Sequence, residues 1–310
     1  MFLTQFIRKY ISTPSIRIIA NIFLKFHWLD KFILVRMDGG ICSQMHFYLI
    51  GNEFEKHGFR VKYNLEWFRK LGMDMNGVHV RNFDLTKAFP SLPFKQANMI
   101  ESTLYQAFAK PRDYSLIDPS EWVTAIPPAY LNGFYRTPQG LYNTIPDLFN
   151  IDLSVLDERN LALYNEIEKK DNSVAVHVRR GDLAVFNNAY GEPVGTSYFQ
   201  KSIEYIEKYM GCSGYYYFFS DEPDWVKDVL IHNLELSDNY QVVDFNGSDK
   251  GYMDLFLISS CRHQITSKGS LGKFGGLLRK SRNNKIIICD DEYQRNEWDN
   301  QSSSVVFIKP

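Results

Sequence analysis

VAVHVRRGD, residues Val174–Asp182, is an apolar, β-branched run that passes into two arginines, a glycine and an aspartate. This pattern predicts a buried strand that presents polar side chains at its carboxyl end, where open α/β sheets bind their ligands. The planar guanidinium groups of Arg179 and Arg180 fit phosphate oxygens, so the pair favours a diphosphate ligand. A solvated basic turn after a core strand is the alternative interpretation.

The sequence on either side of this segment alternates between predicted strands and helices. Strands are predicted at 215–219, 241–245, 263–266 and 286–289, and helices at 197–210, 252–261 and 274–278. This alternation indicates a parallel, doubly wound sheet. The N-terminal half opens in the same way, with a predicted strand at 32–36, a glycine pair and a helix at 43–58. We therefore expect an α/β protein of two Rossmann-like domains, residues 1–160 and 161–310.

Polar loops follow three of the predicted strands, and the carboxyl ends of parallel strands meet at one edge of a sheet. Besides the arginines, the loop before the helix at 274–278 offers hydroxyl and backbone N–H groups to an anion. A carboxylate of the Ser-Asp-Glu loop would accept the N–H donors of a guanine base. Routine turn or cap chemistry is the alternative for each loop taken singly. The candidate ligand-binding residues are His177, Arg179, Arg180, Ser220, Asp221, Glu222, Ser267 and Ser270.

Composition excludes several classes of function. The net charge of −1 gives no overall attraction to nucleic acid, so we expect no nucleic-acid partner. The chain has no Asp-x-Asp clamp, no zinc-type cysteine spacing and no complete P-loop or dinucleotide motif. We expect no metal and no cofactor, and interpret the acidic run 290–292 as a solvated turn. Four scattered cysteines favour a reduced, cytoplasmic protein.

The first thirty residues are apolar and basic. Charged residues interrupt them before any run reaches the ~18–20 residues of a membrane-spanning helix, and we find no signal-peptide pattern. Two interpretations stay open: residues 1–30 lie on an anionic membrane face, or they form a helix that packs on the first domain.

The segment His177–Asp182 resembles the His-x-Arg-Arg-x-Asp signature of fucosyltransferases that form α-1,2 and α-1,6 linkages or modify proteins. Further motifs follow in an order similar to glycosyltransferase family 11, the α-1,2-fucosyltransferases. They are Gly39–Met45 (GGICSQM), Gly133–Arg136 (GFYR), Phe219–Glu222 (FSDE), Tyr252–Leu255 (YMDL), Cys261–His263 (CRH) and Thr266–Ser270 (TSKGS).

Two motifs depart from the family pattern. The family's Gly-Asn before the glutamine is Cys42-Ser43 here, and its Ser-Phe-Ser-Trp-Trp-Gly block is reduced to GSLGKFG at 269–275. The resemblance is therefore to a divergent member, and the lack of a visible membrane anchor implies the bacterial type.

The resemblance implies a GT-B fold, with a donor cleft between an acceptor-side N-terminal domain and a C-terminal domain that binds the GDP-sugar. It implies inverting, metal-independent transfer of L-fucose from GDP-fucose to a hydroxyl, such as O2 of a galactoside. The acceptor would be an oligosaccharide or glycolipid in surface polysaccharide (O-antigen or capsule) synthesis. Gly39, Gly40 and Gln44 would line the cleft from the N-terminal side.

Roles for the signature residues follow from their chemistry. Arg179 and Arg180 would stabilise the charge that grows on the leaving diphosphate. Asp182 would orient an arginine through an ion pair or act as general base, and two neighbouring arginines favour the orienting role. His177 would contact the nucleotide, orient the arginines or serve the core. Asp254, on an apolar helix, requires a buried partner.

Two alternatives to fucosyl transfer remain at this stage. One is a transferase for a different GDP-sugar. The other is a non-catalytic, nucleotide-binding protein of an assembly at the membrane face. In each case we expect a cytoplasmic protein, with peripheral contact to the inner membrane through residues 1–30 as a further hypothesis.

Overall fold

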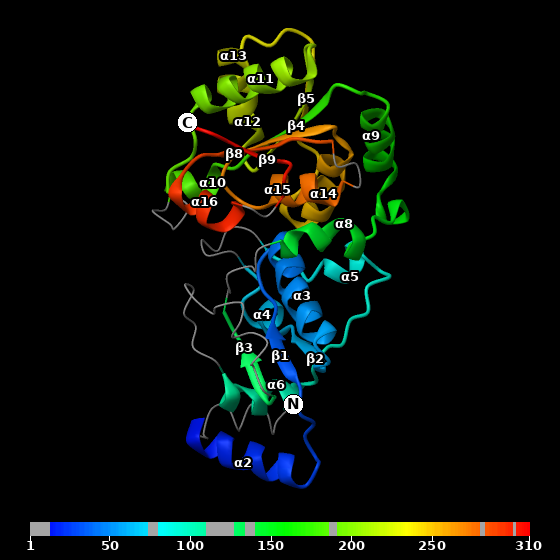
Figure 1. Ribbon diagram of the computed structural model, residues 1–310, viewed down its shortest axis with the longest axis vertical. Helices are drawn as coiled ribbons and strands as arrows, with labels where there is room; N and C mark the ends of the chain where they lie inside the picture. The colour runs from blue at the N-terminus through cyan, green and yellow to red at the C-terminus, as the bar shows by residue number, and fades with distance from the viewer. Residues whose placement is uncertain are drawn as a thin grey trace. The chain divides into compact units, whose positions relative to one another are not determined.

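The computed structural model describes residues 13–73, 80–109, 127–133, 140–185, 191–279, 283–299 and 302–310. The chain forms two compact units (Figure 1). The first comprises Met1–Met75, Arg81–Thr86 and Leu92–Pro138, and the second Asn76–Val80, Lys87–Ser91 and Gln139–Pro310. Each unit has its own parallel sheet, which confirms the α/β class.

The second unit is built on a six-stranded parallel sheet with the order β6-β5-β4-β7-β8-β9. The chain runs outward from β4 to β6 and then starts again on the other side of β4 with β7. The topological switch point of this doubly wound sheet therefore lies between β4 and β7. The strands are β4 (Ser173–Val178), β5 (Tyr215–Ser220), β6 (Tyr240–Val243), β7 (His263–Thr266), β8 (Ile286–Cys289) and β9 (Val305–Ile308).

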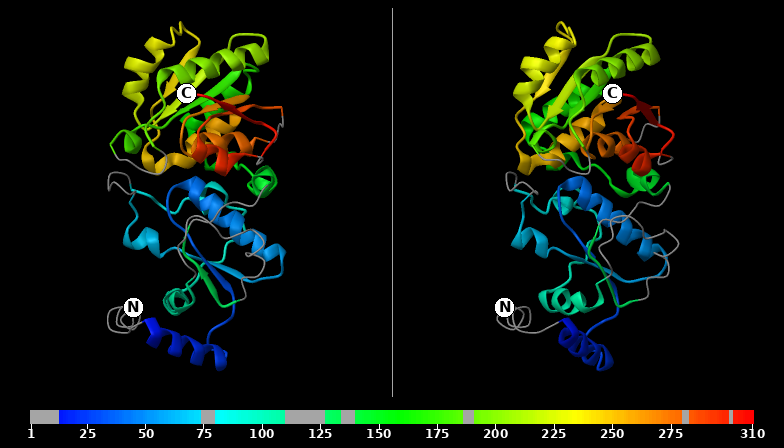
Figure 2. Two further views of the ribbon diagram at one scale, coloured as in Figure 1. Left: turned by 60° about the vertical axis from the view of Figure 1, so that its left-hand side comes forward. Right: turned by 90° about the vertical axis from the view of Figure 1, so that its left-hand side faces the viewer.

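Helices cover both faces of this sheet (Figure 2). Alternate side chains of a strand point to opposite faces. Val174, Val176 and Val178 join the cluster under α11, whereas Ala175 joins the one under α9 and α14. Burial on both faces explains why β4 is a continuous apolar run. The helices are α8 (Ile145–Leu148), α9 (Glu158–Glu168), α10 (Gly181–Val185), α11 (Thr196–Met210), α12 (Pro223–Trp225), α13 (Ile231–Asn233), α14 (Gly251–Ser260), α15 (Leu271–Leu278) and α16 (Glu292–Trp298), with short turns η2 (Leu141–Thr144), η3 (Leu153–Val155), η4 (Val226–Leu230) and η5 (Ser248–Lys250).

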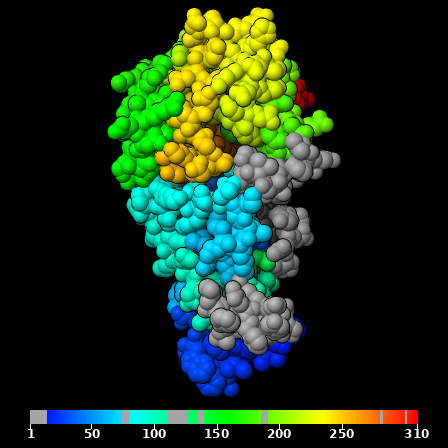
Figure 3. All heavy atoms as spheres, turned by 180° about the vertical axis from the view of Figure 1, so that it is seen from behind, coloured from blue at the N-terminus to red at the C-terminus, as the bar shows by residue number. Residues whose placement is uncertain are grey.

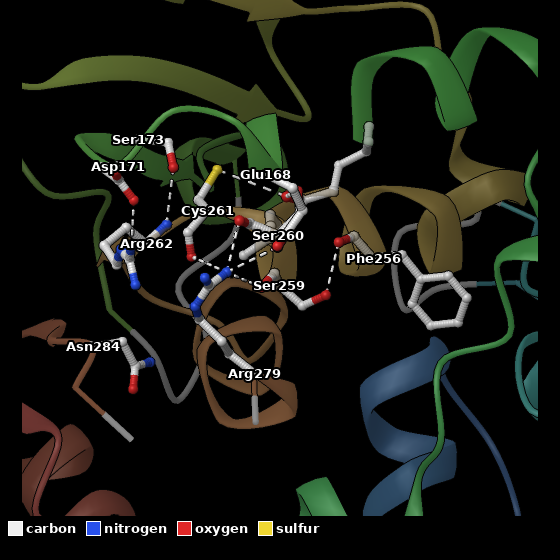
Figure 4. Close-up of polar contacts among 12 residues, drawn as sticks. Glu168, Asp171, Ser173, Phe256, Ser259, Ser260, Cys261, Arg262, Arg279 and Asn284 are labelled. Carbon is white, nitrogen blue, oxygen red and sulfur yellow. Dashed lines mark hydrogen bonds and ion pairs between the residues drawn. The ribbon is translucent and has the colours of Figure 1, made fainter. Parts of the chain in front are cut away.

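Arg279 closes the carboxyl end of α14 (Figure 4). Its Nη1 donates to the carbonyl oxygens of Ser259, Ser260 and Cys261 at 3.2, 2.7 and 3.3 Å, and to a Glu168 carboxylate oxygen at 3.1 Å. The last carbonyls of a helix have no partner within the helix, so a cationic side chain stabilises them. Because Arg279 directly follows α15, this contact fixes α15 against α14 and α9.

Residues 139–160 belong to the second unit, although the sequence analysis placed them in the first domain. The ring of Tyr142 lies 5.2 Å from that of Phe274 on α15 and 4.9 Å from that of Trp298 on α16, measured between centroids. Packing of aromatic side chains from distant segments, which local sequence pattern does not report, accounts for the difference.

The first unit has a three-stranded parallel sheet with the order β2-β1-β3. As predicted, a strand, a glycine pair and a helix follow one another, here as β1, Gly39-Gly40 and α3. Of the resemblance at 133–136, only Gly133 lies within the described residues. The elements are α2 (Thr13–Lys25), β1 (Ile33–Arg36), α3 (Ile41–Lys56), β2 (Val61–Asn64), α4 (Glu66–Lys70), α5 (Leu85–Ala88), α6 (Met99–Leu104), η1 (Tyr105–Phe108) and β3 (Ala129–Leu131).

Helix α2 packs on the core of this unit. Ile16 and Ala20 are buried in a cluster with Phe32 and Tyr105, and the Arg17 guanidinium donates to the Ala107 carbonyl at 3.0 and 3.2 Å. One face of the N-terminal segment therefore packs on the first unit, as one of the two interpretations expected. Within the described part of the chain, no helix is long and apolar enough to cross a membrane.

Candidate functional site

The turn that follows β4 is held from both sides by the neighbouring strands. The backbone N–H of Arg179 donates to Ser267 Oγ at 2.8 Å, from the end of β7. The N–H groups of Arg180 and Gly181 donate to the two carboxylate oxygens of Asp221, beyond β5, at 2.9 and 3.1 Å. The three predicted polar loops therefore meet at one edge of the sheet, next to the switch point.

Both arginine side chains are held in place yet partly exposed. Arg179 makes a two-bond ion pair with Asp182, with Nε and Nη2 at 2.9 and 2.5 Å from the carboxylate oxygens. Arg180 bonds to Glu222 at 3.2 Å and its guanidinium stacks 3.7 Å from the ring centroid of Trp225. The two arginine side chains keep 29% and 20% of their surface exposed. The turn thus presents two fixed cationic groups to solvent.

Several predicted ligand groups instead support this turn. Both oxygens of Asp221, which was predicted as a guanine acceptor, accept backbone N–H groups of the turn. Glu222 pairs with Arg180, and Ser267 is fully buried. Ser220 Oγ donates to the Val178 carbonyl at 2.8 Å and accepts the N–H of Glu222 at 3.0 Å. In this structure these residues hold the turn that carries the arginines.

Asp221 is an exposed residue whose carboxylate oxygens lie against the backbone of the turn after β4. The protein around the carboxylate partly removes it from water, which raises its pKa above the usual value, while the amide of Arg180 and the charge of Arg179 act in the opposite direction. Ser270, by contrast, is half-buried and precedes the first residue of α15 without a side-chain capping bond. Of the predicted anion-binding serines, Ser270 is therefore the one whose surroundings suit a ligand contact.

His177 lies inside the strand end, with 7% of its surface exposed. Its ring packs over α15, because a Cβ added at Gly272 would lie 2.7 Å from His177 Cβ. Burial, with the charges of Arg179 and Lys273, lowers the His177 pKa to about 3. The imidazole is therefore neutral at neutral pH, and its Nδ1 has no hydrogen-bond partner among the described residues.

Gly269 lies beneath Arg179 with a φ of +98°. A Cβ at this position would come within 2.8 Å of Arg179 Cδ, and left-handed backbone favours glycine. The glycine therefore permits both the turn before α15 and the close approach of the arginine.

The predicted cleft residues of the first unit divide into two kinds. Gly39 and Gly40 are half-buried at the end of β1, and Gly39 has a φ of +70°. Gln44 is fully buried, and its amide makes four hydrogen bonds. Gln44 Nε2 donates to the carbonyls of Gly39 and Asn82 at 3.0 and 2.8 Å. Its Oε1 accepts the N–H groups of residues 84 and 85 at 2.9 and 3.0 Å. All four positions of the amide are occupied, so Gln44 ties the turn to residues 82–85 and does not line a ligand site.

Sequence reasoning missed three groups near these strand ends. Arg36 forms a 2.8 Å ion pair with Asp38 beside the glycine pair. The ring of Trp225 packs against the guanidinium of Arg180. Lys273 is 1% exposed, donates from Nζ to Gln294 and lies 5.1 Å from the ring centroid of Trp298, and burial lowers its pKa to about 8. The sequence signal for Lys273 was its position within the otherwise apolar helix α15.

Asp254 has the partner that the sequence analysis required. Asn246 Nδ2 donates to its carboxylate at 2.7 Å, and burial raises the Asp254 pKa to about 7. The acidic run, in contrast, is not merely a solvated turn, since Asp291 accepts the N–H of Gln294 and caps α16. Among the described residues, no group of three His, Cys, Asp or Glu side chains is arranged to hold a metal.

The fold and site define a doubly wound α/β protein with a cationic strand edge at its switch point. Residues 70–305 match the family described as Glycosyl transferase family 11, and the chain belongs to this family. The O-antigen biosynthesis glycosyltransferase WbnK of Escherichia coli is 27% identical over 145 residues. That alignment covers 46% of this chain and 46% of the relative, so the chain spans about half the length of the curated relative it matches.

Two solved structures resemble the chain at low identity. ADP-heptose LPS heptosyltransferase II of E. coli has a TM-score of 0.47 at 11% identity, covering 89% of this chain and 90% of that one. A family 9 glycosyl transferase from Veillonella parvula has a TM-score of 0.44 at 11% identity, covering 91% of this chain and 86% of that one.

Proposed function

We propose that this protein transfers L-fucose from GDP-fucose to a glycan hydroxyl, such as O2 of a galactoside, with inversion at the anomeric carbon. The observation that carries the proposal is the pair Arg179 and Arg180, fixed at the switch point of a parallel sheet. Guanidinium groups in such a place suit the two phosphates of a nucleotide-sugar. Fucose as the sugar rests on the resemblance of His177–Asp182 to the fucosyltransferase signature.

In this mechanism, the bond between C1 of fucose and the β-phosphate oxygen breaks while the acceptor hydroxyl attacks C1 from the opposite face. The electron pair of the broken bond stays on GDP, so negative charge grows on the diphosphate. The proton of the attacking hydroxyl passes to water as the new bond forms. Arg179 and Arg180 stabilise that charge, and because they are already in position, little reorganisation accompanies the reaction. Two guanidinium groups supply the neutralisation that a divalent metal would otherwise give, so the proposed reaction needs no metal.

Asp182 acts in this proposal as a positioning residue. Its carboxylate is engaged by two bonds from Arg179, which suits orientation of the guanidinium better than removal of a proton from the acceptor. His177 contributes a neutral imidazole whose Nδ1 has no protein partner in the described residues. In this proposal His177 serves as a buried support for the turn that carries the arginines.

The relative WbnK supports the biological setting of the proposal. Its name places that protein in O-antigen biosynthesis. We propose the same class of pathway here, with an oligosaccharide or glycolipid of a surface polysaccharide as acceptor. The two-domain GT-B arrangement, with the donor in the C-terminal unit, belongs to the same proposal.

Calorimetric titration with GDP, GDP-fucose, GDP-mannose and UDP, with EDTA throughout, tests the donor. We expect the guanine nucleotides to bind and UDP not to bind. Failure of GDP and GDP-fucose to bind would remove the basis of the proposal. Transfer assays with a galactoside acceptor then separate the alternatives. Transfer from GDP-mannose alone identifies a different sugar, and binding without any transfer identifies a nucleotide-binding assembly protein.

A further inference from the structure

Helix α2 carries an apolar face that the first unit does not cover. Ile18, Ile22 and Phe26 are spaced four residues apart, so they form one stripe along the helix. Their exposed fractions are 62%, 44% and 56%, and Trp28 is 68% exposed. We call these four side chains the α2 outer face. Since Ile16 and Ala20 bury the opposite side, the outer face points away from the core.

Trp28 is exposed but ordered. His27 adopts a left-handed backbone with a φ of 58°, and the chain folds back so that the Trp28 N–H donates to the Phe23 carbonyl at 2.8 Å. The indole stacks on Phe26, with ring centroids 5.4 Å apart, and meets Phe23 edge-on at 5.4 Å. Left-handed backbone is unfavourable for a non-glycine residue. Here that conformation places a large aromatic side chain where it remains in contact with water.

The segment that precedes Asp30 carries charges of one sign in its sequence. Residues 1–29 contain no Asp or Glu, but they include Arg8, Lys9, Arg17 and Lys25, in a chain of net charge −1. Of these, Arg17 and Lys25 lie on α2 itself and are exposed. The chain is therefore cationic at this end and net negative elsewhere.

We propose that the α2 outer face docks on an anionic lipid bilayer. The apolar stripe would enter the boundary between headgroups and acyl chains, and the aromatic pair Phe26 and Trp28 suits that interface. Lys25 would lie at the level of the anionic headgroups. A second copy of the chain is a poorer partner, because it would bring two faces of the same positive charge together.

The position of α2 within the first unit suits this role. It precedes β1 and packs on Phe32, so it lies where the strands of the sheet begin, and its atoms form the outer surface there (Figure 3). Gly39 and Gly40 follow the carboxyl end of β1. Docking through α2 therefore leaves the glycine turn uncovered.

Sedimentation of the full chain with vesicles tests the proposal, using phosphatidylglycerol mixed with phosphatidylethanolamine and, in parallel, phosphatidylcholine alone. We expect binding to the anionic vesicles that falls as salt rises. The triple variant Ile22→Ser, Phe26→Ser, Trp28→Ser should bind at least tenfold more weakly. Leu71→Ser, which changes a residue of the first unit that is 66% exposed, is the matched control and should bind like the parent.

Two further variants separate charge from apolar contact. Lys25→Gln should weaken binding to anionic vesicles about fivefold. Trp28→Phe should still bind but lose the blue shift in tryptophan emission that insertion produces. Circular dichroism and thermal unfolding verify that each variant is folded.

Equal binding to both kinds of vesicle, or none to the anionic ones, would overturn the proposal. So would a dimer in sedimentation velocity that the triple variant abolishes, since a second copy would then cover the face. None of these outcomes depends on whether the protein binds GDP.

Discussion

The turns after β1 and after β4 occupy equivalent places in the two units and use their polar groups differently. Each has an arginine at the strand end paired with a nearby aspartate, Arg36 with Asp38 at 2.8 Å and Arg179 with Asp182 at 2.5 Å. In the first unit, Gln44 lies behind the turn and bonds it to the chain at 82–85. In the second, groups from the flanking strands hold the turn.

The comparison of the two turns separates residues that hold the backbone from residues that a ligand can contact. Gln44, which is fully buried with all four hydrogen bonds of its amide made, fixes the backbone of the first turn. Asp221, whose two oxygens accept backbone N–H groups, fixes the backbone of the second. Arg179 and Arg180 stay partly exposed, with 29% and 20% of their side-chain surface accessible, so a ligand can reach them. A polar residue at the end of a strand is therefore a candidate for ligand binding only if hydrogen bonds within the protein do not already occupy its polar atoms.

The largest effect is expected at the arginines of the β4 turn. Arg179→Ala and Arg180→Ala should each lower kcat/KM for transfer about 10²–10³-fold, because each removes one preorganised cation from the leaving diphosphate. Arg36→Ala is the matched control, with the same strand-end position and ion pair. It should leave GDP affinity within about threefold of the parent. Comparable loss of GDP affinity in all three variants would contradict the distinction between the turns.

A second experiment asks whether Gln44 is framework. Gln44→Ala leaves two carbonyls and two backbone N–H groups without partners, at a cost of about 1–3 kcal/mol for each group that stays unsatisfied. We expect a loss of about 3 kcal/mol or more in the free energy of unfolding, measured with urea. GDP affinity of the folded variant should change less than about threefold. If the variant is as stable as the parent but binds GDP or acceptor poorly, Gln44 contributes to ligand binding and the framework role is contradicted.

The smallest effect concerns the protonation of His177. Its folded-state pKa of about 3 lies below the ordinary value of 6.5, so the unfolded chain binds the proton more tightly. Stability from this group is complete above pH 6.5 and falls as the pH drops toward 3. Between pH 7 and 5 we expect a loss of about 2 kcal/mol that His177→Asn removes. Denaturant unfolding at each pH measures it, and exposed His57→Asn is the control. An unchanged pH dependence in His177→Asn would contradict the buried, neutral imidazole.

The sheet of the second unit could be predicted because its strands are buried on both faces, so that residues 174–178 and 286–289 read as apolar runs. The meeting of the three loops followed from the parallel topology. The role of each side chain in these loops could not be predicted in the same way. Asp221 accepts the amides of Arg180 and Gly181, 41 and 40 positions earlier, through strand register that the sequence does not display. The acidic run 290–292 was misinterpreted because α16, which Asp291 caps, has too few apolar residues to show a helical pattern in the sequence.

The hydrogen bond from Arg179 to Ser267 has a consequence for how the protein folds. These residues are 88 positions apart, so the contact closes a loop that spans the intervening strands and helices. Closing so long a loop is among the slower steps for a chain of this topology. The β4 turn therefore acquires its final shape late, and a folding intermediate that lacks β7 has the arginines but not their arrangement. Nucleotide binding would then report completed folding of the second unit, not merely its presence.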